Sequence, residues 1–300
     1  MEEKFEQVEK KLKKAGQEHL LKYYERITDD KKKENFLNSI LTIDFDAINE
    51  IYLDSKKNIT NKDFVIEPIK FIDKEKIDEK EYAEYEKLGK DIIKSGKLAV
   101  VTMAGGQGTR LGHTGPKGTF DLGLESHKSI FEILCDTLKS ENERYGVSVP
   151  WYIMTSDENN SETVEFFEKH NYFGYNKGDI FFFTQSKLPM VDTNGKCLID
   201  EKGNIKEAAD GHGGIFKSIL KSGALYDMQS RGIEWVFIGG VDNVLVKPVD
   251  PVLIGLSIKD NVDAAGKSII KANPHEKVGI FCKRNGRPSV IEYFLFHQLD

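Results

Sequence analysis

The sequence predicts an α/β fold, in which a mostly parallel sheet is flanked by helices and carries appended antiparallel hairpins and a helical N-terminal region. From residue 98 onward, short uncharged apolar runs alternate with amphipathic segments, which is typical of parallel strands buried on both faces. Asn-Gly pairs at 194–195 and 285–286 separate short apolar runs and predict hairpins. Because the apolar side chains before residue 96 show helical spacing only, we divide the chain into a helical region, 1–95, and an α/β domain, 96–300.

Length and composition limit the classes of protein to which the chain can belong. Three hundred residues with 39 % hydrophobic content are enough for one large domain or two modest ones. The net charge of −6 argues against a nucleic-acid surface, which needs a basic face. Three widely separated cysteines predict neither a disulfide framework nor a metal site. Since there is no long apolar stretch and no apolar signal segment, we expect no membrane span and a cytoplasmic location.

In the helical region, Phe5, Val8 and Leu12 fall at helical spacing and predict an amphipathic first helix. Asp44 is placed to cap a later helix, and a last helix is expected to end near Gly96. The lysine runs of this region are interpreted as solvated faces. No residue before position 96 indicates chemistry.

The α/β domain begins with a predicted buried strand over Leu98–Met103. Ser129 and Glu132 have the spacing of a capping box and predict the start of a helix. Ser161 is expected to cap the next helix, and a further helix follows Gly214. More strands are expected at 151–154, 180–183 and 235–238.

The first strand of this domain runs into a glycine-rich loop that contains two cations. Gly105, Gly106 and Gly108 are followed by Arg110 and Lys117. Glycine lets backbone N–H groups approach an anion closely, and the two cations add full charges. The stretch therefore predicts a loop that binds phosphate.

Two familiar phosphate motifs do not fit this loop. The dinucleotide fingerprint G-x-G-x-x-G needs a glycine where Leu111 stands. A P-loop, G-x-x-x-x-G-K-[ST], fits the sequence at 266–268 except that its first position is Asn261. The glycine loop therefore belongs to a different kind of phosphate site.

Ligands of a parallel sheet bind at the carboxyl ends of its strands, so the residues that follow each apolar run are candidates. Asp242 follows one run, and its carboxylate suits Mg²⁺. Gln185 follows another, and its amide can both donate to and accept from the edge of a pyrimidine ring. His212 lies in a second glycine-rich turn at 209–214, where it is placed to hydrogen-bond a sugar phosphate.

The loop sequence AGGQGTRLG, followed by PKG, resembles that of the eukaryotic-type UDP-sugar pyrophosphorylase family, most of all its UDP-N-acetylglucosamine branch. The resemblance covers roughly residues 40–293 and includes FTQ at 183–185, DGHGG at 210–214, VDN at 241–243 and IEY at 291–293. It implies a Rossmann-like fold of the nucleotide-diphospho-sugar transferase type. The residue roles that it implies are catalysis by Arg110 and Lys117, nucleotide binding by Met103, Ala104, Gly105, Gly106, Gln185, Gly211 and Asp242, sugar-phosphate binding by His212, Gly279 and Glu292, and metal binding by Asp242.

The activity that the resemblance implies is Mg²⁺-dependent uridylyl transfer. UTP and a hexose-1-phosphate would give a UDP-sugar and pyrophosphate, by positioning and charge neutralisation. N-acetylglucosamine-1-phosphate is the expected sugar. Glucose-1-phosphate is the alternative, because His212 stands where N-acetylglucosamine-type members usually carry asparagine and glucose-type members often carry histidine.

The family's sequences continue well past the position of Asp300, with further sheet, a second basic phosphate contact and a C-terminal domain. We therefore expect a C-terminally truncated domain, and the alternative to a transferase is a nucleotide-binding remnant with little turnover. UTP affinity is expected to survive better than hexose-phosphate affinity, because Glu292 lies near the chain end. Unpaired strand edges predict self-association, while the native oligomeric state is left open.

Overall fold

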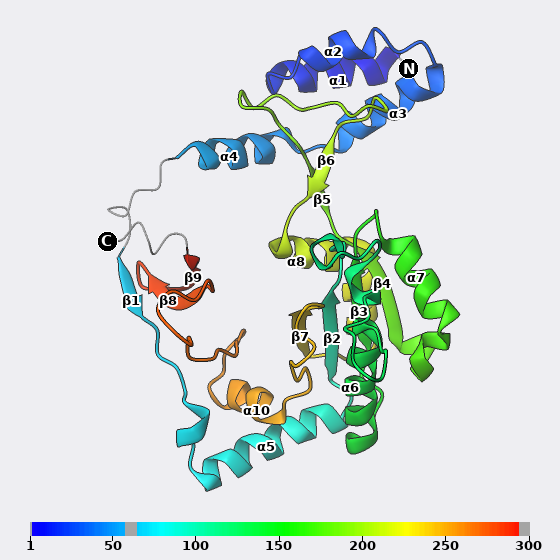
Figure 1. Cartoon of the computed structure of the whole chain (residues 1–300). Coiled ribbons are helices and arrows are strands. Elements are labelled where there is room, and N and C mark those ends of the chain that lie inside the picture. Colours follow the sequence, from blue (N-terminus) through cyan, green and yellow to red (C-terminus); the bar gives the residue numbers. More distant parts are fainter. Residues whose placement is uncertain (1, 58–64, 294–300) are drawn as a thin grey trace. The chain divides into compact units, whose positions relative to one another are not determined.

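A computed structural model describes residues 2–57 and 65–293 of the protein (Figure 1). The chain divides into two compact units. The first joins the N-terminal helices to Lys187–Asp210, and the second contains Ile66–Ser186 and the described residues 211–293. The first unit is therefore assembled from two separate stretches of sequence, and the boundary expected at residue 95 remains a prediction.

The first unit is a set of helices against which the 187–210 segment packs. Buried Gln17 connects the two stretches: its Nε2 donates to the carbonyl oxygen of Gly195 at 2.8 Å, and its Oε1 accepts from the N–H of Cys197 at 2.9 Å. The predicted hairpin at 194–195 is confirmed, with Val191 bridged to Cys197. Cys197 and Ile205 then lie in one apolar cluster with the helices. The local sequence pattern does not predict that the 187–210 segment packs on these helices.

The ends of the first unit's helices follow local chemistry. The Asp44 carboxylate accepts from the N–H of Ala47 at 3.0 Å, which confirms the predicted cap. Asp29 caps the preceding helix in the same way, through the N–H of Lys32 at 2.7 Å. The elements of this unit are α1 (Glu2–Lys14), α2 (His19–Tyr24), α3 (Asp30–Thr42), α4 (Phe45–Lys56), β5 (Lys187–Pro189) and β6 (Glu207–Ala209).

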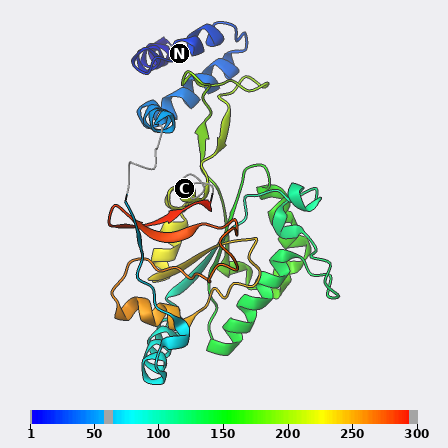
Figure 2. The same cartoon turned by 60° about the vertical axis from the view of Figure 1, so that its left-hand side comes forward.

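The second unit is built on a four-stranded parallel sheet of order β4-β3-β2-β7. Its strands are β2 (Leu98–Met103), β3 (Trp151–Thr155), β4 (Ile180–Thr184) and β7 (Trp235–Gly240). β2 lies between β3 and β7, so its carboxyl end has a neighbouring strand on each side (Figures 1 and 2). The predicted parallel sheet and all four of its predicted strands are confirmed.

One helix start in this unit differs from the prediction. The capping box is confirmed, since Ser129 Oγ accepts from the N–H of Glu132 at 3.2 Å. The cap predicted at Ser161 is wrong, because the helix already starts at Asn160 and Ser161 therefore lies inside its first turn. The remaining helices and turns are α5 (Glu79–Lys94), α6 (Ile130–Tyr145), α7 (Asn160–Lys169), α8 (Ile215–Ser222), α9 (Ala224–Ser230), α10 (Pro251–Lys259), η2 (Lys74–Lys76), η3 (Thr109–Leu111), η4 (Lys117–Thr119), η5 (Asn171–Gly174), η6 (Lys177–Asp179) and η7 (His212–Gly214).

Alternate residues of β2 face opposite helical layers. Leu98 and Val100 belong to a buried cluster with the apolar face of α6, including Phe131. Ala99 and Val101 belong to a second cluster with residues of α8 and α9. Both faces of the sheet are therefore covered, which explains why β2 is a continuous apolar run.

Helices α5 and α10 cross at two glycines. A Cβ at Gly89 would lie 1.9 Å from the carbonyl oxygen of Pro251, and one at Gly255 would lie 1.8 Å from the carbonyl oxygen of Tyr85. Any larger residue would push the helices apart. The crossing fixes α10, and with it the far end of the loop that leaves β7.

A separate antiparallel sheet of order β1-β8-β9 belongs to the same unit (Figure 2). Its strands are β1 (Ile66–Pro68), β8 (Ile280–Arg284) and β9 (Arg287–Ile291). The predicted hairpin is confirmed, with Asn285 and Gly286 at φ values of 51° and 77°. The pairing of β1 with β8 was not predicted, because a three-residue strand that ends in proline carries little sequence signal.

The three cysteines are buried and unpaired, each in a different place: Cys135 in α6, Cys197 in the first unit and Cys282 in β8. Burial raises the pKa of the Cys135 thiol to about 12 and that of the Cys197 thiol to about 11. Within residues 2–57 and 65–293, no helix is both long and apolar enough to span a membrane.

Candidate nucleotide-binding site

The loops that follow β2 and β7 leave the sheet together. The N–H of Val241 donates to the carbonyl oxygen of Met103 at 3.0 Å, and the N–H of Ala104 donates to that of Met154 at 2.7 Å. Ala104 is fully buried, so the glycine loop starts from a fixed point between β3 and β7. The carboxyl edge of the sheet therefore carries the glycine loop next to the turn that contains Asp242.

The glycine loop folds back on itself as a narrow hairpin. The N–H of Gly108 donates to the carbonyl oxygen of Gly115 at 2.9 Å, and the N–H of Lys117 donates to that of Gly106 at 3.1 Å. Gly118 lies against a ring, since a Cβ there would be 2.1 Å from Phe131. Lys117 thus returns beside the start of the loop, and packing on α6 holds it there.

The two predicted catalytic cations have different surroundings. The Nζ of Lys117 lies 2.6 Å from Oδ1 of Asp242, so a residue predicted for catalysis and the residue predicted for metal binding form an ion pair. Arg110 stands exposed in η3, and no ion pair or hydrogen bond of its guanidinium is found among the described residues. Lys117 is therefore held by an ion pair, whereas the guanidinium of Arg110 is exposed to solvent.

Gln185, Gly105 and Gly211 lie together on the other side of the loop. A Cβ at Gly105 would be 3.1 Å from Oε1 of Gln185, and Nε2 of Gln185 donates to the carbonyl oxygen of Gly211 at 2.8 Å. Nearby, Nδ1 of His212 lies 3.3 Å from the sulfur of Met103. The structure thus brings together residues from 103–106, 185 and 211–212, although these lie far apart in sequence.

Gly279 and Glu292 lie close to each other on the second sheet. A Cβ at Gly279 would lie 3.7 Å from Oε1 of Glu292. In the part of the chain that the structure describes, no hydrogen bond or ion pair joins either residue to the glycine loop. The predicted sugar pair is therefore assembled, but it is not linked to the predicted nucleotide residues.

The surroundings of Asp242 fit a metal ion that arrives with phosphate. Its side chain is exposed at the end of β7, and no group of three or more metal-ligating side chains gathers among the described residues. Mg²⁺ is usually held by one or two carboxylates together with substrate phosphates and water. Asp242 would supply that single carboxylate.

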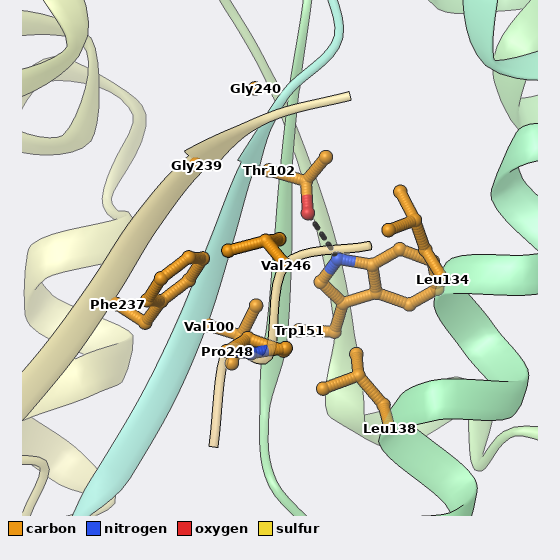
Figure 3. Close-up of a pocket in the computed structure, with 10 residues that line it drawn as sticks. All are labelled: Val100, Thr102, Leu134, Leu138, Trp151, Phe237, Gly239, Gly240, Val246 and Pro248. Atoms are coloured by element: carbon orange, nitrogen blue, oxygen red, sulfur yellow. Dashed lines mark hydrogen bonds between the residues drawn. The ribbon is translucent and has the colours of Figure 1, made fainter. Parts of the chain in front are cut away.

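A small cavity lies under Gly239 and Gly240, with Trp151 donating its indole N–H to Thr102 Oγ1 at 2.8 Å (Figure 3). Its volume of about 20 Å³ is enough for about one water molecule and far too small for a nucleotide. The other lining residues are the apolar Val100, Leu134, Leu138, Phe237, Val246 and Pro248. The cavity is therefore a packing feature beneath the site, and the residues predicted for the nucleotide lie on the loops at the carboxyl edge.

Sequence reasoning missed one residue of this region. Asn159 is fully buried in the turn after β3, and its side chain contacts the carbonyl groups of the glycine loop. The available signal was its place just after a buried strand, which also drew attention to Gln185 and Asp242. A lone asparagine in a polar turn did not stand out from its neighbours.

A parallel sheet with a glycine loop, a lysine–aspartate pair and a glutamine at its carboxyl edge has the arrangement expected of a domain of the nucleotidyltransferase type. A family model described as UTP–glucose-1-phosphate uridylyltransferase matches residues 42–298. The chain therefore belongs to that family, which confirms the resemblance seen in its glycine loop.

Individual relatives agree with this assignment. The chain is 44 % identical to UDP-N-acetylglucosamine pyrophosphorylase of Saccharomyces cerevisiae over 218 residues, which cover 70 % of this chain and 45 % of that protein. It is 36 % identical to UDP-N-acetylglucosamine diphosphorylase 1 of Arabidopsis thaliana over 300 residues, covering 94 % and 59 %. The chain thus spans about half the length of the curated relatives that it matches.

A solved structure shares this fold. The crystal structure of the uridine diphosphate N-acetylglucosamine pyrophosphorylase from Trypanosoma brucei, in complex with an inhibitor, superimposes with a TM-score of 0.79 at 29 % identity. The match covers 100 % of this chain and 63 % of that protein. The predicted fold type is therefore confirmed.

Proposed function

We propose that this chain contains the nucleotide-binding part of a uridylyltransferase that forms UDP-N-acetylglucosamine from UTP and N-acetylglucosamine-1-phosphate. The observation that carries the proposal is the convergence of Lys117, Asp242 and Gln185 at one edge of the sheet. Each comes from a loop that follows a different parallel strand, and ligands bind where such loops meet. The names of the relatives support the uridine nucleotide and the amino sugar.

The reaction needs positioning and charge neutralisation. An oxygen of the sugar phosphate attacks the α-phosphorus of UTP, the new P–O bond forms, and the bond from that phosphorus to the bridging oxygen breaks to release pyrophosphate. Lys117 and Arg110 offset the negative charge that develops on the phosphates. Mg²⁺ bound at Asp242 would supply further positive charge to the same oxygens. The ion pair of Lys117 with Asp242 keeps both side chains at the place where they are needed.

Gln185 is assigned to the base. Its amide can donate to a carbonyl oxygen of uracil and accept from the ring N–H. In the structure its Nε2 is turned to Gly211, a residue that is also assigned to the nucleotide. A bound base would replace that contact.

The sugar phosphate is assigned to His212, Gly279 and Glu292, with glucose-1-phosphate as the alternative because of His212. A cytoplasmic location is also part of the proposal, since the substrates are soluble metabolites. A second candidate function, nucleotide binding with little transfer, is favoured by the absence of any described contact between the Gly279–Glu292 pair and the glycine loop.

Binding and transfer measured on one sample test the proposal. We expect calorimetry to show UTP binding that is stronger with Mg²⁺ and stronger for UTP than for CTP. Pyrophosphate release should then be greater with N-acetylglucosamine-1-phosphate than with glucose-1-phosphate. Binding without release would favour the second candidate, and a failure to bind UTP at millimolar concentration would exclude both.

A further inference from the structure

The side chain of Asn159 is hydrogen-bonded at every polar atom in the interior of the second unit. Its exposed fraction is 0 %. Nδ2 donates to the carbonyl oxygen of Ala104 at 3.1 Å and to that of Gly106 at 3.3 Å. Oδ1 accepts from the N–H of Ser156 at 2.8 Å. The amide therefore ties the turn after β3 to the glycine loop.

These bonds fix the direction of two peptide units in the loop. In a trans peptide the N–H points opposite to the carbonyl oxygen. Because the oxygens of Ala104 and Gly106 point to Asn159, the N–H groups of Gly105 and Gln107 point away from it. Neither N–H has a hydrogen-bond partner among the described residues. The loop thus holds two unpaired donors with one orientation.

Asn159 does not act as an ordinary helix cap. It flanks the start of α7, yet its side chain makes no hydrogen bond to the first turn of that helix. The adjacent Asn160 makes a different contact, accepting at Oδ1 from the hydroxyl of Thr155 at 2.7 Å. Only the first of these two neighbours reaches the glycine loop.

We propose that Asn159 is a positioning residue, which holds the N–H groups of Gly105 and Gln107 toward bound UTP. The inference rests on the proposed function, since it needs a nucleotide at the glycine loop. The location of the two donors supports it: Gly105 lies against Gln185, and the carbonyl group that precedes Gln107 also accepts from the N–H of Lys117. The donors therefore lie between the residues assigned to the base and to the phosphates.

The variants Asn159→Ala and Asn160→Asp form a matched pair for calorimetry with UTP. We expect Asn159→Ala to weaken UTP binding about tenfold or more, which is the range for losing oriented hydrogen-bond donors. Asn160→Asp keeps the acceptor for Thr155 and adds a negative charge at a helix N-terminus, so it should bind UTP like the parent. Equal UTP affinity in a folded Asn159→Ala variant and in the parent would overturn the proposal.

A measurement on the unmodified chain tests the same inference without any risk to folding. In an amide NMR titration, UTP should shift the resonances of Gly105 and Gln107 more than those of Gly123 and Gly146, which lie in turns outside the glycine loop. A parent that binds UTP without shifting these two amides refutes the positioning role and leaves the proposed function intact. A parent that binds no UTP refutes both.

Discussion

The two sheets of the second unit present their predicted ligand-binding residues in different ways. At the carboxyl edge of the parallel sheet, loops that are far apart in sequence meet, and contacts link Lys117 to Asp242 and Gln185 to Gly105. On the antiparallel sheet, Gly279 and Glu292 are brought together by a single hairpin. Buried packing on both faces supports the first arrangement, whereas Phe281 and Val290 of the hairpin are about half exposed.

The difference indicates which residues should couple to one another. A parallel sheet holds several loops side by side, so a substitution in one loop changes the contacts of the neighbouring loops. A hairpin fixes only its own two strands. Substitutions at the parallel edge should therefore affect nucleotide binding and transfer together, and substitutions on the hairpin should affect the sugar alone.

The largest effect is expected for Lys117→Ala. We expect kcat/KM for UTP to fall by about 10²-fold or more, because a lost electrostatic donor costs on the order of 2.7–4 kcal/mol. Lys97→Ala is the matched control, since Lys97 pairs with Glu234 at 2.7 Å at the amino ends of the same two strands. Steady-state kinetics of pyrophosphate release measure both variants. Unchanged kinetics in Lys117→Ala would show that Lys117 does not act on the phosphates. The parallel-sheet edge would then lose its assigned role in transfer.

Asp242→Asn should come next. Its shape is preserved but its charge is lost, so Mg²⁺-dependent UTP binding should weaken about tenfold or more, as for other contacts to charged groups. Binding without Mg²⁺ should change little, and Glu234→Gln should leave both values unchanged. Calorimetric titrations at several Mg²⁺ concentrations give the comparison. The same Mg²⁺ dependence in Asp242→Asn and the parent would argue that the carboxylate serves only its ion pair.

Glu292→Gln tests the hairpin side. We expect KM for the sugar phosphate to rise about fivefold, because a hydrogen bond to a charged carboxylate is replaced by one to a neutral amide, while Kd for UTP stays at the parent value. Kinetics with varied sugar phosphate, together with UTP calorimetry, separate the two effects. A parallel loss of UTP affinity would show that the two sheets are coupled, contrary to the comparison.

Gln185→Ala should have the smallest effect and act on selectivity. The preference for UTP over CTP should fall a few fold, because the alanine can no longer complement the uracil edge. The N–H of Gln185 still donates to the carbonyl oxygen of Thr155, so the backbone should hold its place. A competition assay with the two nucleotides measures the ratio. An unchanged ratio would assign base recognition to the backbone of the glycine loops.

The sequence was most informative where a local pattern and a general rule coincided. Strand β2 was predicted from its apolar run, Lys117 from its place in a glycine-rich loop, and Asp242 from the rule that ligands bind at the carboxyl ends of parallel strands. The link between Gln17 and the 187–210 segment was not found, since it joins residues about 180 positions apart and leaves no periodic trace. Asn159 was missed for a related reason. Its side chain bonds to the carbonyl oxygens of Ala104 and Gly106, more than 50 positions away, and the local sequence does not show this contact.

The three buried cysteines allow local opening of the structure to be measured by chemical labelling. A thiol reagent reaches them only when the surrounding structure opens, so the labelling rate reports the free energy of that opening. Cys135 reports on the layer behind the parallel sheet, Cys197 on the first unit and Cys282 on the hairpin sheet. Labelling followed by mass spectrometry can therefore time the exposure of three regions in one unmodified chain. We expect Cys282 to be labelled before Cys135, and UTP to slow the labelling of Cys135 more than that of Cys197.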